Sequence, residues 1–196
     1  MGDTQRCGHA RCLPRQAAVE MAPLMGSNPT DLERRLDNGD TVTHFLETLT
    51  GELLVAEVVR QYPVMAGTDN ALGVAAGHAA THRISVLKGR STDVAYLYAE
   101  STFVPERLPH EVRAQLERTS DPIGRVLVAH GLGLKREPLL QRGPVGVHLP
   151  STDVDLASEI VWSRQYRLTI DGQPAFAIGE WFFRSVLDAL DRDAGD

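Results

Sequence analysis

The 196-residue sequence has no long apolar run and no excess of basic residues. Its apolar runs, such as residues 95–99, are far shorter than the ~20 residues that a membrane-spanning helix needs. Twenty basic residues against 26 acidic ones give a net charge of −6, whereas proteins that bind a nucleic-acid backbone carry a basic surface. These absences exclude a membrane protein, and they predict that neither a membrane nor a nucleic acid is a partner.

Cysteine is also scarce. Cys7 and Cys12 are the only cysteines, and with His9 they form C-x-H-x-x-C. No fourth ligand stands at the spacing of a zinc finger, so we expect two reduced thiols and no metal. The first thirty residues lack the apolar core of a secretory signal, because charged residues and a proline interrupt them. We therefore expect a cytoplasmic protein.

The length and the 42% of apolar residues are sufficient for one domain with a packed core and a walled pocket. Residues 1–29 are rich in Gly, Pro and Arg and show no sustained periodicity. We predict a flexible leader over residues 1–29, followed by a single domain over residues 30–196.

Hydrophobic periodicity predicts about six strands and about three or four short helices. Strands are expected over residues 41–48, 52–61, 79–88, 94–103, 164–170 and 173–183. Helices are expected over residues 30–36, 105–119 and 121–130. Residues 131–158 are loop-rich, and we expect them to cover part of the functional site. Because the strand–helix alternation of a parallel sheet is missing, we predict an α+β fold with an antiparallel sheet.

Two charged residues of the predicted strands could do chemistry. Arg83 lies opposite apolar neighbours, so it either points to solvent or guards a cavity. Glu180 shares a strand face with Phe176, Ile178 and Phe182. A carboxyl group on such a face is costly unless an arginine pairs with it or it stays protonated, which is how catalytic acids are often made. A structural ion pair or a position at the sheet edge would explain Glu180 equally well.

A third feature is the predicted helix start Asp121-Pro122-Ile123-Gly124-Arg125. Free backbone N–H groups at a helix start attract carboxylates, and the glycine permits close approach. Most helix starts bind nothing. An arginine, such a helix start and one carboxylate in an apolar wall together fit a small, multiply negative, partly hydrophobic ligand.

Five blocks, in this order and with these spacings, resemble the chorismate pyruvate-lyase family. The blocks are Val42-Thr43-His44-Phe45-Leu46-Glu47, Arg83-Ile84-Ser85-Val86-Leu87, Ala99-Glu100-Ser101, residues 121–125, and Tyr166-Arg167 with Gly172-Gln173-Pro174 and Glu180. The resemblance extends from about residue 32 to about residue 187. The chain looks most like the actinobacterial branch that makes 4-hydroxybenzoate, which shares the Leu-Lys-Gly-Arg turn at residues 87–90.

The resemblance implies a six-stranded antiparallel sheet with short helices on one side and an internal ligand cavity. It implies a lyase that removes the enolpyruvyl group of chorismate as pyruvate and aromatises the ring to 4-hydroxybenzoate, without metal or organic cofactor. The family's carboxylate-binding arginine matches Arg83, its active-site glutamate Glu180, and its backbone amide donor Ile123, with Gly124 beside it. A backbone contact of the family falls on Val42.

One position departs from the family pattern. Proteobacterial members carry an arginine at the position of Glu100, and an acid facing the cavity would repel a dianion. Glu100 would have to turn to solvent or pair with Arg60 or Arg125, so we count these three among the candidate site residues. The difference keeps open a relative that acts on another enolpyruvyl or aromatic acid.

A second class of function also remains open. The ligand-sensing domain of GntR-type transcriptional regulators has a related fold and binds small anions. Such regulators carry an N-terminal winged helix of some seventy residues, whereas about thirty irregular residues precede the predicted domain here. We therefore expect the enzyme rather than the sensor. The sequence leaves the oligomeric state undetermined.

Overall fold

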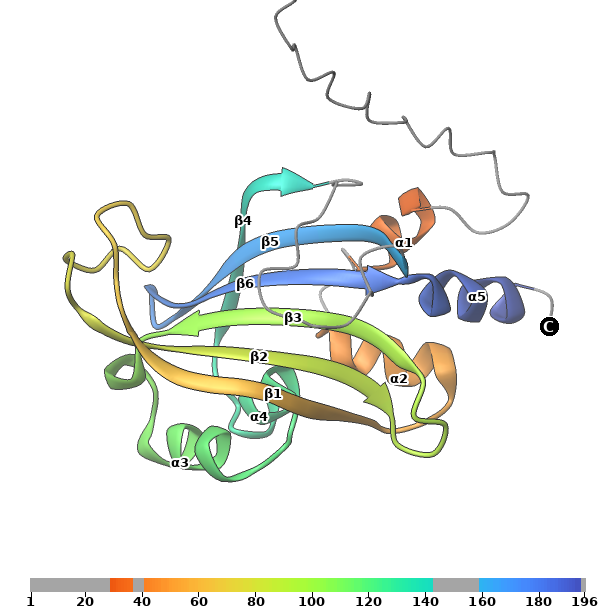
Figure 1. The fold of residues 1–196 in the computed structure, drawn as a ribbon, viewed down its shortest axis with the longest axis horizontal. Helices are drawn as coiled ribbons and strands as arrows, with labels where there is room; N and C mark the ends of the chain where they lie inside the picture. Colours follow the sequence, from red (N-terminus) through yellow and green to blue (C-terminus); the bar gives the residue numbers. More distant parts are fainter. Residues whose placement is uncertain (1–28, 37–40, 143–158, 195–196) are drawn as a thin grey trace, which may run out of the picture.

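In a computed structural model of the chain, which describes residues 29–36, 41–142 and 159–194, six strands form one antiparallel sheet (Figure 1). Their order across the sheet is β1-β2-β3-β6-β5-β4. The strands are β1 (Leu54–Met65), β2 (Ala79–Gly89), β3 (Ala95–Phe103), β4 (Leu134–Arg142), β5 (Ile160–Ile170) and β6 (Gln173–Phe183). The helices are α1 (Pro29–Leu36), α2 (Val42–Thr50), the 3₁₀ turn η1 (Pro105–Arg107), α3 (His110–Arg118), α4 (Ile123–Ala129) and α5 (Arg184–Asp193). The predicted α+β fold is confirmed.

The helices pack on one face of this sheet. Leu97 of β3 lies opposite Phe182 of β6, and both join a core with α1, α2 and α5. Further along the same two strands Phe103 lies opposite Phe176, and both join a second core with α3 and α4. Residues that are an even number apart on a strand share a face, so both cores lie on the same side of the sheet. A ligand site between sheet and helices is therefore confined to this side.

Residues 42–50 form the helix α2, where a strand over residues 41–48 was predicted. Thr41 caps α2, because its hydroxyl accepts a hydrogen bond from the backbone N–H of His44 at 3.2 Å. Gly51 ends the helix at φ +69°, a conformation that suits glycine. Val42 and Leu46 are buried four residues apart, which is helical spacing. The threonine-rich composition favoured a strand, but the apolar period and the two caps determine the structure.

The strand β4 lies within a segment predicted to be loop-rich. It pairs with β5 at the edge of the sheet, and its charged residues show no clear alternation of apolar and polar positions. Residues 143–158, which were expected to cover the site, lie outside the described residues. The helix α5 was not predicted, although Val186, Leu187 and Leu190 have helical spacing and are buried.

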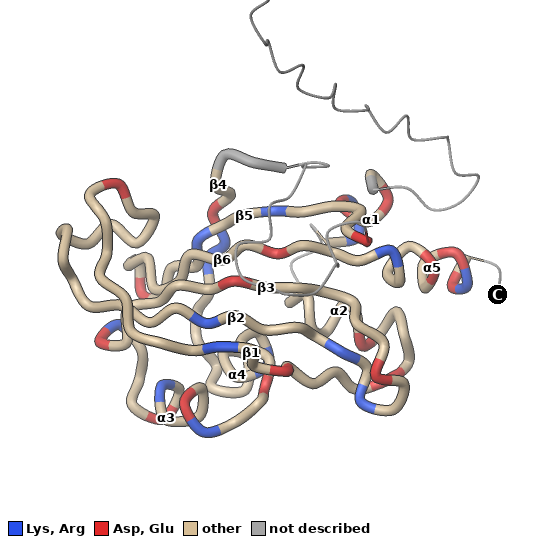
Figure 2. Tube along the Cα trace, viewed as in Figure 1, with Lys and Arg blue, Asp and Glu red and all other residues tan. Residues whose placement is uncertain are grey.

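The two hairpins with the strongest turn signals are confirmed. β5 and β6 are joined at Asp171 and Gly172, which have φ values of +50° and +77°. β2 and β3 pair antiparallel, so Arg83 lies opposite Ser101. Figure 2 shows isolated charged positions within these strands among uncharged ones. In the described part of the chain, no helix is long and apolar enough to cross a membrane.

Glu52 fastens the β2–β3 hairpin to the start of β1. Its carboxylate accepts hydrogen bonds from the backbone N–H groups of Ser91 and Thr92, at 3.1 and 3.3 Å. The hydroxyl groups of Thr92 and Tyr96 also donate to it, at 2.7 and 3.2 Å. Burial opposes the ionisation of Glu52, but the hydrogen bonds from Thr92, Ser91 and Tyr96 outweigh it and lower the pKa of this carboxyl.

We expect Glu52→Gln to lower the free energy of unfolding at pH 7 by about 1 kcal/mol, because an amide accepts fewer hydrogen bonds. Since the folded-state pKa lies below the unfolded-state pKa, the carboxylate stabilises above the unfolded value and loses this effect as the pH falls through the folded value. Urea denaturation should therefore show a constant difference from pH 7 to about 5 and a smaller one below about pH 4. A difference that is unchanged in acid would contradict this role.

Candidate functional site

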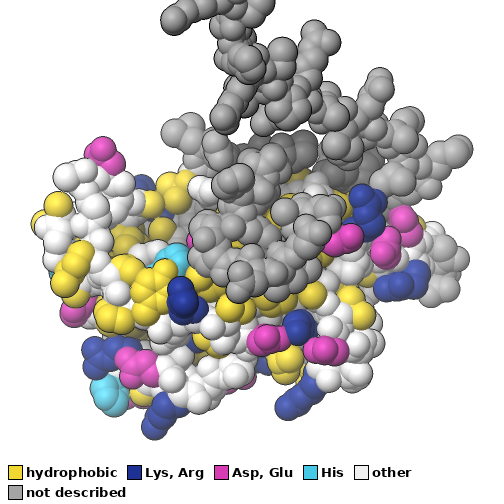
Figure 3. Space-filling view, in the orientation of Figure 1, with side chains coloured by type: hydrophobic (Ala, Val, Ile, Leu, Met, Phe, Trp, Pro, Cys, Tyr) yellow, Lys and Arg dark blue, Asp and Glu magenta, His cyan; other side chains and the backbone are white. Residues whose placement is uncertain are grey.

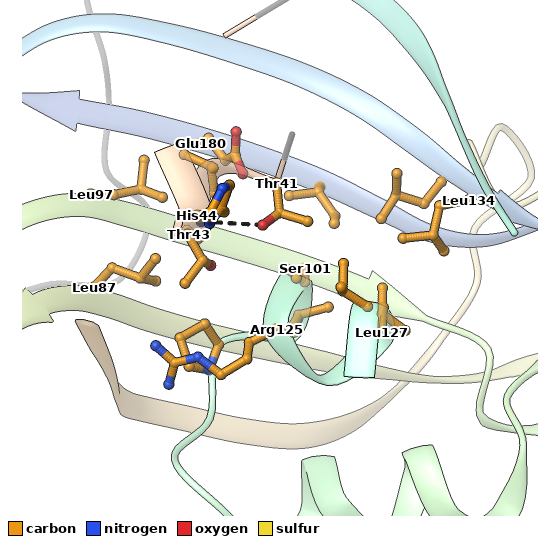
Figure 4. Close-up of a pocket in the computed structure, with 18 of the residues that line it drawn as sticks. Thr41, Thr43, His44, Leu87, Leu97, Ser101, Arg125, Leu127, Leu134 and Glu180 are labelled. Atoms are coloured by element: carbon orange, nitrogen blue, oxygen red, sulfur yellow. Dashed lines mark hydrogen bonds between the residues drawn. The ribbon is translucent and has the colours of Figure 1, made fainter. Parts of the chain in front are cut away.

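A cavity of about 840 Å³ lies between the sheet and the helices α2 and α4 (Figure 4). Its walls come from α2 and α4 and from the inner face of β2, β3, β4, β5 and β6. The volume is within the range of small-molecule sites. The cavity implied by the family resemblance is present, and it includes the side chain of Glu180.

Glu180 lines this cavity from the middle of β6, where only 2% of it is exposed. Both of its oxygens accept strong hydrogen bonds from β5. Arg164 donates from Nε to Oε2 at 2.6 Å, and the Tyr166 hydroxyl donates to Oε1 at 2.8 Å. Two fixed donors, one of them cationic, hold the carboxyl group in one orientation. Glu180 is thus placed to exchange a proton with a ligand in the cavity.

Burial raises the pKa of the Tyr166 hydroxyl far above its ordinary value, and the negative charge of Glu180 adds to this effect. Tyr166 therefore stays protonated and donates to Glu180. Arg164 and Tyr166 alternate along β5 and share the face of Glu180, so strand parity could have found both. The sequence analysis named Tyr166 only within a family block and did not name Arg164 as the partner.

Arg83 lies on the same side of the sheet but is not part of the cavity lining. It is 1% exposed, and it donates from Nη1 to the carbonyl oxygen of Leu116 at 2.7 Å and from Nη2 to that of Asp121 at 3.2 Å. Its Nε has no hydrogen-bond partner among the described residues. Burial lowers the pKa of this guanidinium while the charge of Asp121 raises it. Arg83 therefore holds a buried positive charge close to the cavity but outside its lining. Its hydrogen bonds also fix the segment that leads into α4.

Val42, Ile123 and Gly124 line the cavity from the first turns of α2 and α4. The two turns come close together at Gly124, where an added Cβ would lie 3.0 Å from the Cβ of Thr41. The first backbone N–H groups of a helix have no partner within the helix. The structure thus brings together three of the predicted contacts along one wall.

The remaining candidates have different positions. Arg125 lines the cavity, but it forms an ion pair with Glu47, and its guanidinium lies on the side away from Glu180 (Figure 4). Glu100 points from the opposite face of the sheet, where it accepts a hydrogen bond from the Tyr98 hydroxyl at 2.6 Å. Arg60 lies over the ring of Tyr62, 5.9 Å from its centre. Neither Glu100 nor Arg60 lines the cavity, so the expected repulsion between Glu100 and a bound dianion does not arise.

The opposite face of the sheet also carries an apolar cluster. Ile84, Val86, Tyr98 and Phe183 form a separate buried cluster there. Figure 3 shows hydrophobic side chains gathered over part of the molecular surface, next to a histidine and a basic side chain. The residues that line the cavity, among them Glu180, lie on the other, helix-covered side.

No group of three or more His, Cys, Asp or Glu residues suited to a metal ion occurs in the described ranges. The Cys7, His9 and Cys12 motif lies outside them. One cavity residue that the sequence analysis did not name is Arg136 of β4, which stacks on Tyr166 with its guanidinium carbon 5.0 Å from the ring centre. It adds positive charge to the wall that holds Glu180.

No model of a known protein family matches the chain. The chain is 27% identical over 162 residues to the chorismate pyruvate-lyase of Mycobacterium tuberculosis H37Rv, covering 80% of this chain and 81% of that protein. It is 27% identical over 173 residues to the chorismate pyruvate-lyase of Mycobacterium leprae, covering 85% and 80%. This similarity confirms the resemblance to chorismate pyruvate-lyases that the sequence blocks indicate.

Solved structures of regulatory domains share the fold. The C-terminal domain of the histidine utilization repressor from Pseudomonas syringae pv. tomato matches with a TM-score of 0.50 and 16% identity, covering 67% of this chain and 92% of that one. The effector domain of PhnF from Mycobacterium smegmatis matches with a TM-score of 0.52 and 12% identity, covering 74% and 90%. At these identities the likeness shows the fold alone.

Proposed function

We propose that the protein is a cofactor-independent lyase that converts chorismate into 4-hydroxybenzoate and pyruvate. The observation that carries this proposal is the Glu180 carboxylate, buried and doubly hydrogen-bonded on the wall of a cavity large enough for the substrate. The chorismate pyruvate-lyases to which the chain is similar provide the reaction. The enzyme would supply 4-hydroxybenzoate to a biosynthetic pathway.

The reaction needs no strong nucleophile. The bond between the ring and the ether oxygen breaks, the ring carbon that bears the hydroxyl loses its proton, and the leaving enolpyruvate takes up a proton to become pyruvate. Glu180 lies where it can receive or relay a proton between the ring and the departing group. Aromatisation supplies the driving force, so correct orientation and fixed charges account for most of the rate enhancement.

Substrate orientation depends on the carboxylates of chorismate. We propose that backbone N–H groups at Ile123 and Gly124, with the backbone of Val42, contact the substrate at the helix wall. Arg83 contributes positive charge from behind this wall and holds the carbonyl groups of Leu116 and Asp121 in place. A charged group in a low-dielectric interior acts over several ångströms, so direct contact is not required.

Incubation of the purified protein with chorismate alone tests this function. We expect pyruvate and 4-hydroxybenzoate to appear in equal amounts, with pyruvate measured by a coupled reduction and the aromatic product by its ultraviolet spectrum. Heat-denatured protein serves as the control. The absence of both products at high enzyme concentration would overturn the proposal.

The second candidate function is a sensor module that binds a small anion, and the fold shared with effector domains favours it. Both functions need the cavity, but only a lyase consumes chorismate. Tight binding of an unrelated small acid without any turnover would favour the sensor. Turnover of another enolpyruvyl acid in preference to chorismate would indicate a relative with a different substrate.

A further inference from the structure

Tyr166 lines the cavity beside Glu180, and the proposed reaction gives it no task. Its hydroxyl donates to Oε1 of Glu180 at 2.8 Å from a residue that is 5% exposed. The guanidinium carbons of Arg136 and Arg164 lie 5.0 and 5.1 Å from the centre of its ring. Burial and these contacts hold the ring in place, whereas the hydroxyl proton can still rotate about the C–O bond. Tyr166 thus offers Glu180 a fixed oxygen with a movable proton.

The two oxygens of the Glu180 carboxyl group have unlike partners. Arg164 holds Oε2 through its Nε, and a guanidinium group can donate hydrogen bonds but cannot accept one. A proton placed on Oε2 would therefore weaken a charge-assisted hydrogen bond without gaining an acceptor. The Tyr166 hydroxyl, which faces Oε1, can both donate and accept. A proton placed on Oε1 can be donated to the Tyr166 oxygen, so Oε1 is the better proton acceptor.

The strand register and the chemistry of the phenol keep these roles separate. Arg164 of β5 pairs with Glu180 of β6, and Tyr166 pairs with Ile178, so each donor is confined to its own carboxyl oxygen. Burial, and then the negative charge of Glu180, raises the pKa of the Tyr166 hydroxyl. The hydroxyl therefore keeps its proton at neutral pH. It responds to a change at Glu180 by rotation and not by ionisation.

We propose that Tyr166 is a positioning residue that makes Oε1 of Glu180 the oxygen that takes up a proton. Its hydroxyl donates to the unprotonated carboxyl group and rotates to accept from the protonated one, while Arg164 stays on Oε2. In the proposed lyase reaction, on which this step rests, the C–H bond of the ring carbon breaks and the Oε1–H bond forms. The electron pair of that C–H bond joins the aromatic ring as the ether oxygen departs.

Tyr166→Phe tests this role in turnover, because it keeps the ring and removes only the hydroxyl. We expect kcat for chorismate to fall about 10- to 100-fold, the range that one hydrogen bond to a charged group contributes. The Michaelis constant should stay within about threefold, since Tyr166 acts through Glu180. Tyr98→Phe is the matched control and should keep wild-type kinetics. Tyr98 is also buried and donates to Glu100 at 2.6 Å, but on the opposite face and outside the cavity lining.

Infrared difference spectroscopy follows the reversal in the protein without chorismate. As the pH is lowered, a protonated carboxyl band should appear together with a shift of the tyrosine C–O stretch, whose frequency differs between a donating and an accepting hydroxyl. The part of each signal that Glu180→Gln abolishes belongs to this pair. Tyr166→Phe should keep only the carboxyl band, at a pH about one unit higher, because a donor to the carboxylate is lost. Both variants retain the other titratable groups of the described cavity lining, which are His44, Glu47, Arg125 and Arg136.

The two measurements separate this inference from the lyase assignment. A tyrosine band that stays in place while Glu180 takes up its proton would overturn the inference. If chorismate is turned over and Tyr166→Phe behaves like Tyr98→Phe, only the role of Tyr166 is wrong. If chorismate is not turned over but the two bands move together, the reversal at Oε1 stands and the lyase fails.

Discussion

Glu180→Gln should lower the turnover of chorismate by about 10²- to 10⁴-fold, the range expected for loss of a group that transfers a proton. An amide of nearly the same shape occupies the same place, but it cannot receive a proton or carry the negative charge. The Michaelis constant should change much less, because the groups proposed to bind the substrate carboxylates lie elsewhere in the cavity. Steady-state kinetics with chorismate measure both quantities.

The variant should remain folded. The glutamine oxygen can still accept the hydrogen bond from Arg164, and the Tyr166 hydroxyl can turn to accept one from the new amide group. Only the charge that balances Arg164 is lost, so we expect the free energy of unfolding to fall by about 1–3 kcal/mol. Circular dichroism and urea denaturation check this point independently of activity.

Glu137→Gln provides the matched control. Glu137 accepts a hydrogen bond from Arg167 of β5 at 2.6 Å, the same distance that joins Glu180 to Arg164, but it lies outside the cavity lining. It should keep nearly full turnover. If Glu180→Gln retained more than half of the wild-type rate, Glu180 would be a structural partner of Arg164 and the proton-transfer role would be wrong.

Strand parity allowed the face of Glu180 to be predicted from the sequence, whereas it left open whether Arg83 points to solvent or toward a cavity. Alternation along a strand requires only local information, and the structure places both residues on the helix-covered side. Strand parity alone could not identify the ion-pair partner of Glu180. Arg164 is its neighbour because β6 pairs with β5, whereas β3 separates Glu180 from Arg83. Strand order is a property of the whole fold, so the sequence pattern did not distinguish the two arginines.

The errors in the secondary structure have similar causes. Residues 42–50 contain apolar positions at helical spacing among β-branched threonines, and the period and caps decided in favour of the helix. This helix lines the cavity with Val42 and Thr43. Because a strand was predicted there, the sequence analysis did not predict a helix as one wall of the cavity. Glu100 was considered for the cavity because of the family pattern, although its parity with Tyr98 places it on the opposite face.

Replacement of Arg83 should have the second large effect, because this side chain serves both stability and binding. Arg83→Ala leaves the carbonyl oxygens of Leu116 and Asp121 without their donor and creates a void in a fully buried position. We expect the free energy of unfolding to fall by about 2–5 kcal/mol and the affinity for chorismate to fall sharply. Because this variant changes stability and binding together, Arg83→Lys and Arg83→Gln are compared with it.

Lysine keeps the positive charge and glutamine does not, while neither has the planar guanidinium fork through which Arg83 donates to Leu116, Asp121 and Gln61. If Arg83 acts through its charge, Arg83→Lys should keep the Michaelis constant for chorismate within about fivefold of wild type, and Arg83→Gln should raise it at least about tenfold further. Arg107→Gln is the control, because Arg107 also donates to two backbone carbonyl groups, those of Leu72 and Pro174, away from the cavity lining. It should lower stability without changing the Michaelis constant. Equal Michaelis constants for the lysine and glutamine variants would mean that Arg83 only holds the segment before α4, and the charge that attracts the substrate would then have to come from Arg136 or Arg125.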